Sequence, residues 1–185
     1  MKRLMKCVSG TAVLAAALSL NLNAAPVAPG QVDFGAFTPP GGGGEFVEVN
    51  IGGDLISLAT RVVEKQEPEI AQLLNSIHRV HVNVIGLDDQ NRSELAKRVE
   101  SVRKDLDGKG WERLVAVRQQ AQDVTVYIKM HNKETVDGLV VVVLEDNKQA
   151  VFVNVAGNIR PEQLSLLGDR LHIDALKKAG KTVEK

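Results

Sequence analysis

The chain has 185 residues, 44% of them hydrophobic, and its equal numbers of basic and acidic side chains give no formal net charge. A neutral chain has no bulk attraction to nucleic acid or to anionic membranes. Aromatic side chains make up only 3% of the sequence, whereas proteins that bind single-stranded nucleic acid by stacking need aromatic platforms. The length allows a domain with a hydrophobic core, and nucleic-acid binding is not expected.

Residues 1–24 have the pattern of a secretory signal peptide. Basic residues at 2, 3 and 6 precede an apolar stretch from 8 to 20 that is short for a membrane span, and small residues follow. We expect cleavage after Ala24, because cleavage after Ala25 would leave Pro26 at the first mature position. The protein is then periplasmic or secreted, without a transmembrane span. The alternative is an uncleaved anchor.

Cys7 is the only cysteine and precedes the apolar stretch, whereas a lipidated cysteine follows such a stretch. We therefore expect no lipid anchor, and a mature chain without disulfides or thiolate metal sites. Residues 25–44 are rich in proline and glycine and are predicted to form an extended, flexible tether. Val32, Phe34 and Phe37 are apolar points of this tether that could dock on another surface.

A single domain is predicted over residues 45–176, with a polar tail at 177–185. Residues 45–51 alternate as a strand, and Asp54 is expected to be the N-cap of the helix that follows. Pro68 begins a second short helix and completes a helical hairpin. The apolar residues of the first helix recur at helical spacing: Leu55, Leu58, Ala59, Val62 and Val63.

The rest of the domain is predicted as strand, helix, four strands and helix. Residues 79–86 alternate as a strand, and a helix to Gly108 follows, with Asn91 and Glu94 at capping-box positions. The apolar stripe of this helix consists of Leu95, Val99, Val102 and Leu106. Four further strands, joined by short polar turns, are expected over 111–119, 123–130, 136–144 and 149–156, before a last helix at 161–168. The predicted class is α+β with a mainly antiparallel sheet.

Several motifs of this region resemble a family of secreted bacterial proteins known as domain of unknown function 4252. They are Gly110-Trp111-Glu112, Val126-Tyr127-Ile128-Lys129, Gly138-Leu139 and Val153-Asn154-Val155, and the resemblance covers about residues 45–173. It implies no assigned activity. Many members look like lipoproteins, a feature that this chain lacks. The frequent proximity of such genes to sigma-factor and anti-sigma genes implies a role in envelope signalling.

The sequence offers no recognisable catalytic or metal-binding constellation. His78 and His81 are three apart at a helix-to-strand junction and have no further ligands at zinc-site spacing. The acidic pairs at 88–89 and at 105 and 107 fit capping and turns. Ser101 and Lys104 match a Ser-x-x-Lys spacing, but the partner motifs of penicillin-recognising enzymes are absent. We predict no catalytic residue, no metal and no cofactor.

Residues 139–144 are apolar on both sides of their strand, so both faces of the sheet must be covered there. The helices that start near 91 and 161 can cover one face. A mixed surface remains on the other, closed by the helical hairpin or by a partner, and we predict it as a binding patch: Tyr127, Lys129, Phe152 and Asn154. The sequence thus favours a non-catalytic module of the cell envelope that binds another envelope protein or itself. A small periplasmic hydrolase or ligand-binding protein is the alternative.

Overall fold

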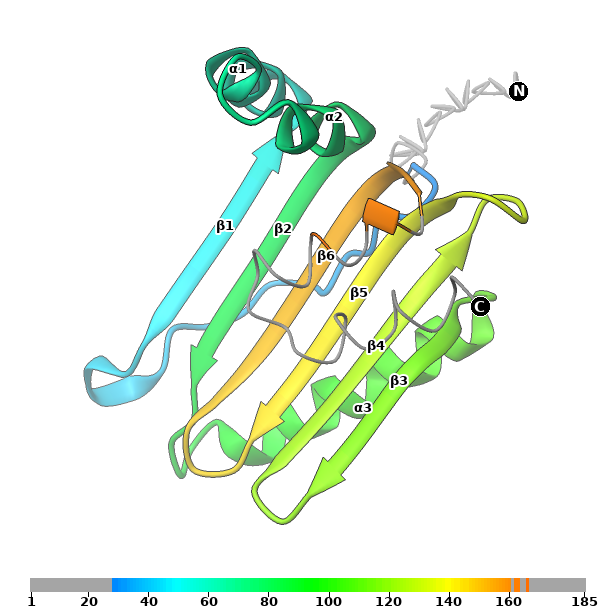
Figure 1. Cartoon of the computed structure of the whole chain (residues 1–185). Coiled ribbons are helices and arrows are strands. Elements are labelled where there is room, and N and C mark those ends of the chain that lie inside the picture. Colours follow the sequence, from blue (N-terminus) through cyan, green and yellow to red (C-terminus); the bar gives the residue numbers. More distant parts are fainter. Residues whose placement is uncertain (1–27, 161, 164–165, 167–185) are drawn as a thin grey trace, which may run out of the picture.

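The computed structural model of the chain describes residues 28–160, 162, 163 and 166 and consists of one antiparallel sheet with three α-helices (Figure 1). The strands are β1 (Phe46–Gly52), β2 (Ile77–Gly86), β3 (Glu112–Gln119), β4 (Gln122–Met130), β5 (Val136–Glu145) and β6 (Gln149–Ile159). The helices are α1 (Gly53–Val63), α2 (Pro68–Ser76) and α3 (Arg92–Gly108), and Gly41–Gly43 form a short 3-10 turn. The α+β prediction is confirmed.

The six strands are ordered β1-β2-β6-β5-β4-β3. Strands β3 to β6 pair consecutively, which confirms the predicted meander, and β2 pairs with β6 on its far side. The predicted signal peptide, most of the predicted helix at 161–168 and the polar tail lie outside the described residues. Among the described helices, none combines the length and apolar character that crossing a membrane requires.

Each face of the sheet carries its own hydrophobic cluster. The chain between β2 and β3 must cross from one side of the sheet to its far edge, so α3 lies across one face, behind the strands in Figure 1. The opposite face is rich in valine, and α1 and α2 pack at its end beside β1 and β2. In β5, four consecutive residues from Leu139 to Val142 are fully buried, which confirms that both faces are covered there.

The helical hairpin does not cover the mixed face, contrary to one of the two predicted closures. Because α1 and α2 connect two neighbouring strands, they stay at one end of β1 and β2 and on the valine-rich side. The mixed face, which carries Tyr127 and Phe152, lies under α3 and under the segment that precedes β1. The prediction that the helix starting near residue 91 covers the opposite face is therefore wrong. The predicted inward stripe of α3 is confirmed: Leu95, Val99, Val102 and Leu106 are all buried there.

The predicted helix caps differ in detail. The N-cap of α1 is Gly52, and Asp54 lies in the first turn without a capping hydrogen bond. Asn91 is the N-cap residue of α3, but its side chain makes no bond to the helix. It accepts a hydrogen bond from the Asp88 backbone and donates one to the Gly86 carbonyl instead. Side-chain bonding within the loop has therefore replaced the predicted capping box.

Candidate functional site

The residues of the predicted binding patch do not form an open surface. Tyr127 and Phe152 are 0% exposed, Asn154 is 1% exposed, and Lys129 is partly buried. All four lie on the face that α3 and the N-terminal segment cover. An external partner therefore cannot reach the three buried side chains while these elements are in place.

Asn154 instead binds the chain's own N-terminal segment. Its Nδ2 donates to the Gly30 carbonyl at 2.9 Å and to the Leu139 carbonyl at 3.1 Å, and its Oδ1 accepts a hydrogen bond from the Val32 amide at 3.0 Å. Gly30 has a φ of +77°, and a Cβ at that position would lie 1.8 Å from the Asp137 carbonyl oxygen. The buried amide thus satisfies its polar atoms with the backbone of residues 30–32.

The aromatic side chains of this segment complete the contact. Phe34 is buried, with its ring centroid 5.5 Å from that of Phe152, and Phe37 lies 4.9 Å from the same ring. Arg98 of α3 donates to the Phe34 carbonyl at 2.7 Å and lies over the Phe37 ring. The segment that composition predicted as a flexible tether is docked from about residue 30 to 37, through the apolar points that the sequence singled out.

Tyr127 and Lys129 both have hydrogen-bond partners, Tyr127 in strand β3 and Lys129 at the end of α3. Arg113 donates from Nε to the Tyr127 hydroxyl at 3.2 Å, and burial raises the pKa of this phenol. Lys129 donates from Nζ to the carbonyls of Lys109 and Gly110 at 2.6 and 3.2 Å. The polar ends of both side chains have hydrogen-bond partners, while their apolar parts are covered by the protein. The polar groups of Tyr127 and Lys129 therefore did not indicate a solvent-exposed face.

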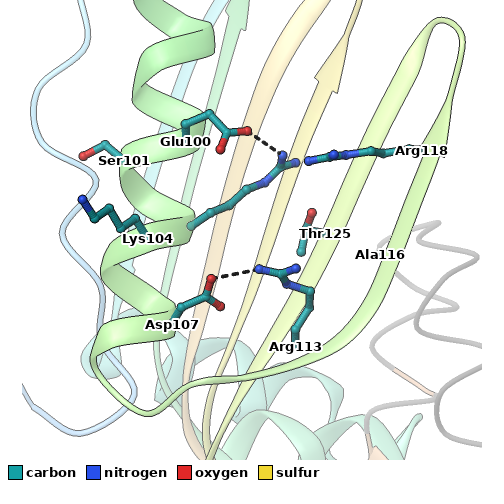
Figure 2. A pocket seen from close by; sticks show the side chains of 9 residues that line it. Glu100, Ser101, Lys104, Asp107, Arg113, Ala116, Arg118 and Thr125 are labelled. Carbon is teal, nitrogen blue, oxygen red and sulfur yellow. Dashed lines mark hydrogen bonds and ion pairs between the residues drawn. The ribbon is translucent and has the colours of Figure 1, made fainter.

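A cleft of about 820 Å³ lies between α3 and the edge strand β3, and Figure 2 shows its lining. Small side chains at Ala116 and Thr125 form its floor and leave room beside the helix. The charged lining comes from both walls: Glu100, Arg103, Lys104 and Asp107 from α3, and Arg113 and Arg118 from β3.

Nearly all charges that point into the cleft are paired with one another. Arg103 is 5% exposed and holds the Asp123 carboxylate with both terminal nitrogens at 2.8 Å. Arg118 lies 3.3 Å from the same carboxylate, and Arg113 pairs with Asp107 at 2.9 Å. Burial by itself would raise the pKa of Asp123, but the bonds and charges of Arg103 and Arg118 outweigh it and lower the pKa.

This arrangement is poorly suited to acid–base or nucleophilic catalysis. A general acid at neutral pH needs a carboxyl with a raised pKa, whereas the pKa of Asp123 is lowered. Ser101 and Lys104 also line the cleft, but their side chains extend away from β3 (Figure 2). The Ser-x-x-Lys spacing therefore does not direct the Ser101 hydroxyl toward the charged groups of β3. The ion pairs tie α3 to strands β3 and β4.

The histidines do not gather into a metal site in the described part of the chain. His81 lies against Phe34, with ring centroids 5.8 Å apart, and bonds to Asn83 Nδ2, while His78 is exposed near the beginning of α1. No three His, Cys, Asp or Glu side chains of the described residues come together as metal ligands. One residue of each acidic pair has a structural role. The Asp88 carboxylate accepts hydrogen bonds from the backbone amides of Gln90 and Asn91, and Asp107 forms a salt bridge with Arg113.

The outer face of α1 is the feature that sequence reasoning missed. Leu55, Leu58 and Val62 are 59, 56 and 69% exposed, and Ala59 between them is also exposed. The core-facing side of the helix carries Ile56 and Thr60 instead. The spacing of Leu55, Leu58, Ala59 and Val62 correctly predicted the helix, but these side chains do not face the core. We call Leu55, Leu58 and Val62 the α1 stripe.

The width of the apolar arc on α1 could have indicated two contact surfaces. At about 100° per residue, its apolar side chains from Leu58 round to Ile56 span about 160°, whereas a stripe of about 100° suits a helix with one buried side. Only the half that contains Ile56 packs on the protein, at Leu73 and Ile77. The other half, which includes the α1 stripe, faces outward.

Comparison with known proteins assigns the chain to a family but does not assign it an activity. The sequence matches the family described as "Domain of unknown function (DUF4252)" over residues 42–167. The chain belongs to this family. The match spans the sheet and all three helices, from the 3-10 turn before β1 to beyond β6. No curated protein and no solved structure matches the chain.

Proposed function

We propose that the protein is an exported, non-catalytic interaction module of the cell envelope that binds a protein partner through the α1 stripe. The observation that carries this proposal is the exposure of three large apolar side chains on one side of α1. Single exposed apolar residues are common, but a contiguous row on a helix face is typical of a binding surface.

The position of the α1 stripe favours binding over a structural role. Leu55, Leu58 and Val62 follow one another at spacings of three and four residues, the pattern with which a helix contacts a groove or another helix. The helix is held to the protein by its other side, with Ile56 and Thr60 each 5% exposed. The outer side of α1 is thus exposed on a helix whose inner side is packed against the domain.

The export part of the proposal rests on residues 1–24. Their basic start, short apolar stretch and small residues at 24 and 25 fit a cleaved signal peptide. A role in envelope signalling belongs to the same proposal. The intact mass of the protein purified from the envelope should correspond to a chain that begins at Ala25, and a mass that includes Cys7 would contradict export with cleavage.

The hydrolase alternative has no comparable support. The cleft beside β3 is lined by six ionisable side chains, and Asp107 of its lining and the neighbouring Asp123 are both paired with arginines. Arg103 and Arg118 lower the pKa of Asp123, which makes this carboxylate a poor general acid at neutral pH. Binding through the α1 stripe requires no such group.

Site-specific photo-cross-linking in the expressing cell tests the binding proposal. A benzophenone amino acid at Leu58 should give a discrete cross-linked product, which Val62→Asp in the same chain should weaken several-fold. Ser57 is the matched control, because it is also exposed but lies about 100° away on the helix. Equal products from both positions, or none from Leu58, would overturn the proposal.

A further inference from the structure

We propose that the partner of the α1 stripe is a second copy of this chain, with the two α1 helices packed antiparallel about a two-fold axis near Leu58 and Ala59. The inference rests on the proposed function and names its partner. In such an isologous contact, every contact between two different residues occurs twice, once in each direction. Antiparallel packing would place Leu55 of one copy opposite Val62 of the other.

Charge complementarity supports the antiparallel orientation. Asp54 lies in the first turn of α1 and Arg61 in its last, and both flank the α1 stripe on the same side of the helix. Both are exposed, and neither forms a salt bridge with a described residue. A two-fold axis reverses the helix direction and keeps the flank, so Asp54 of each copy meets Arg61 of the other. In a parallel two-fold arrangement, the same flank of each helix would lie on opposite sides of the contact, so Asp54 and Arg61 would not meet.

The geometry of the helix leaves room for the second copy. Ile56 and Thr60, which face the core, lie about 140° around α1 from the centre of the α1 stripe. The bodies of two molecules in contact through their stripes therefore point away from each other. In Figure 1, α1 lies at one end of the sheet, beside the edge strand β1.

The composition of the helix favours a protein surface over a lipid surface. Helices that bind in the membrane interface have a strongly charged and mainly basic polar face. The exposed charged residues at and just after α1 balance, with Asp54 and Glu64 against Arg61 and Lys65. A small contact of this kind is expected to give a weak dimer, with a Kd on the order of 10 to 100 μM.

Analytical ultracentrifugation of the purified chain from about 1 to 500 μM tests the proposal. The wild-type protein should pass from monomer to dimer in this range. Leu58→Asp, at the centre of the α1 stripe, should raise the Kd at least about 100-fold without changing the thermal midpoint, because the side chain is more than half exposed.

A charge swap tests the orientation of the two helices. Asp54→Lys and Arg61→Glu should each raise the Kd about tenfold, because each places two pairs of like charges at the contact. The double variant should return the Kd to within about threefold of the wild-type value. Asp54 and Arg61 are seven residues apart on one helix, so the rescue reports a contact between copies. Glu64→Lys, at a position about 150° around the helix from the centre of the α1 stripe, should leave the Kd unchanged.

The outcomes separate this inference from the proposed function. A monomer at all concentrations, or a dimer that Leu58→Asp leaves intact, would overturn the dimer. The protein could instead be a monomer that cosediments with vesicles of phosphatidylglycerol and phosphatidylethanolamine. If Leu58→Asp abolished this binding, the α1 stripe would contact a membrane, and the dimer would be overturned. A monomer whose Leu58 probe still cross-links to a larger protein product would overturn the dimer and leave the proposed function standing.

Discussion

Helices α1 and α3 are both amphipathic, yet they use their apolar residues differently. The large apolar residues of α3 fall within an arc of about 60°, and all of them are buried against the sheet. The apolar arc of α1 is far wider, and its outer half, with the α1 stripe, is exposed. The apolar residues of α3 thus hold the fold together, whereas half of those of α1 are available for binding.

The comparison shows that apolar periodicity identifies a helix but not the surface against which each side packs. A helix with a narrow apolar arc can bury that arc against one surface, whereas a helix with a wide apolar arc can also contact a second surface, on another molecule. Substitutions on α3 and beneath it should therefore unfold the protein, and those on the outer side of α1 should not.

The largest effect is expected for Val99→Asp on α3. Val99 is 1% exposed and belongs to the cluster under the helix, so the change would place an unpaired charge in an apolar environment. Such a change costs several kcal/mol, about the whole stability of a small domain. Far-ultraviolet circular dichroism should show an unfolded or insoluble protein. A soluble Val99→Asp protein with a wild-type melting curve would show that α3 does not cover this face.

Tyr127→Ala is expected to cost about 3 to 5 kcal/mol, because it removes a fully buried aromatic ring from beneath α3. Tyr127→Phe is the matched control and should cost about 1 kcal/mol, since it loses only the hydrogen bond from Arg113. Urea unfolding measures both. Equal midpoints for wild type and Tyr127→Ala would restore Tyr127 as a surface residue, as the sequence first suggested.

The strand meander, the helical hairpin and the buried stripe of α3 could be predicted because each depends on local patterns. The position of Tyr127, Phe152 and Asn154 could not, because it depends on contacts far apart in the sequence. Asn154 satisfies its amide with Gly30 and Val32, more than 120 residues away. A polar residue in a strand indicates either solvent or such a partner, and the pattern alone does not distinguish them.

Asp123→Asn should cost about 2 kcal/mol at neutral pH, because the buried guanidinium of Arg103 loses its charged partner. The pKa of Asp123 is lowered in the folded state. Its stabilising contribution is therefore complete above the unfolded pKa, near 4, and is lost as the pH falls through the folded pKa. Urea midpoints between pH 7 and 2 should fall less steeply for the variant. Glu100→Gln, at the exposed partner of Arg103, should have little effect. Parallel curves for Asp123→Asn and wild type would contradict the role of this pair.

Gly30→Ala should release the N-terminal segment at a cost of about 1 to 2 kcal/mol, since the new methyl group would clash with the Asp137 carbonyl. Exchange of the Val32 amide hydrogen should become at least about tenfold faster. Gly42→Ala is the control, because Gly42 has a similar φ of +72° but open space around its Cβ. If Gly42→Ala accelerated exchange of the Val32 amide hydrogen equally, the effect of Gly30→Ala would come from backbone strain and not from loss of the docking contact.

The smallest effect on stability is expected for Leu58→Asp, and its measurement is the most direct test of the account. The change introduces the same charge as Val99→Asp, but at a side chain that is 56% exposed. Urea unfolding at about 1 μM protein, where association does not contribute, should show a change below about 0.5 kcal/mol. A loss of more than about 2 kcal/mol would place Leu58 in the core, and the α1 stripe would then not be a surface available to a partner.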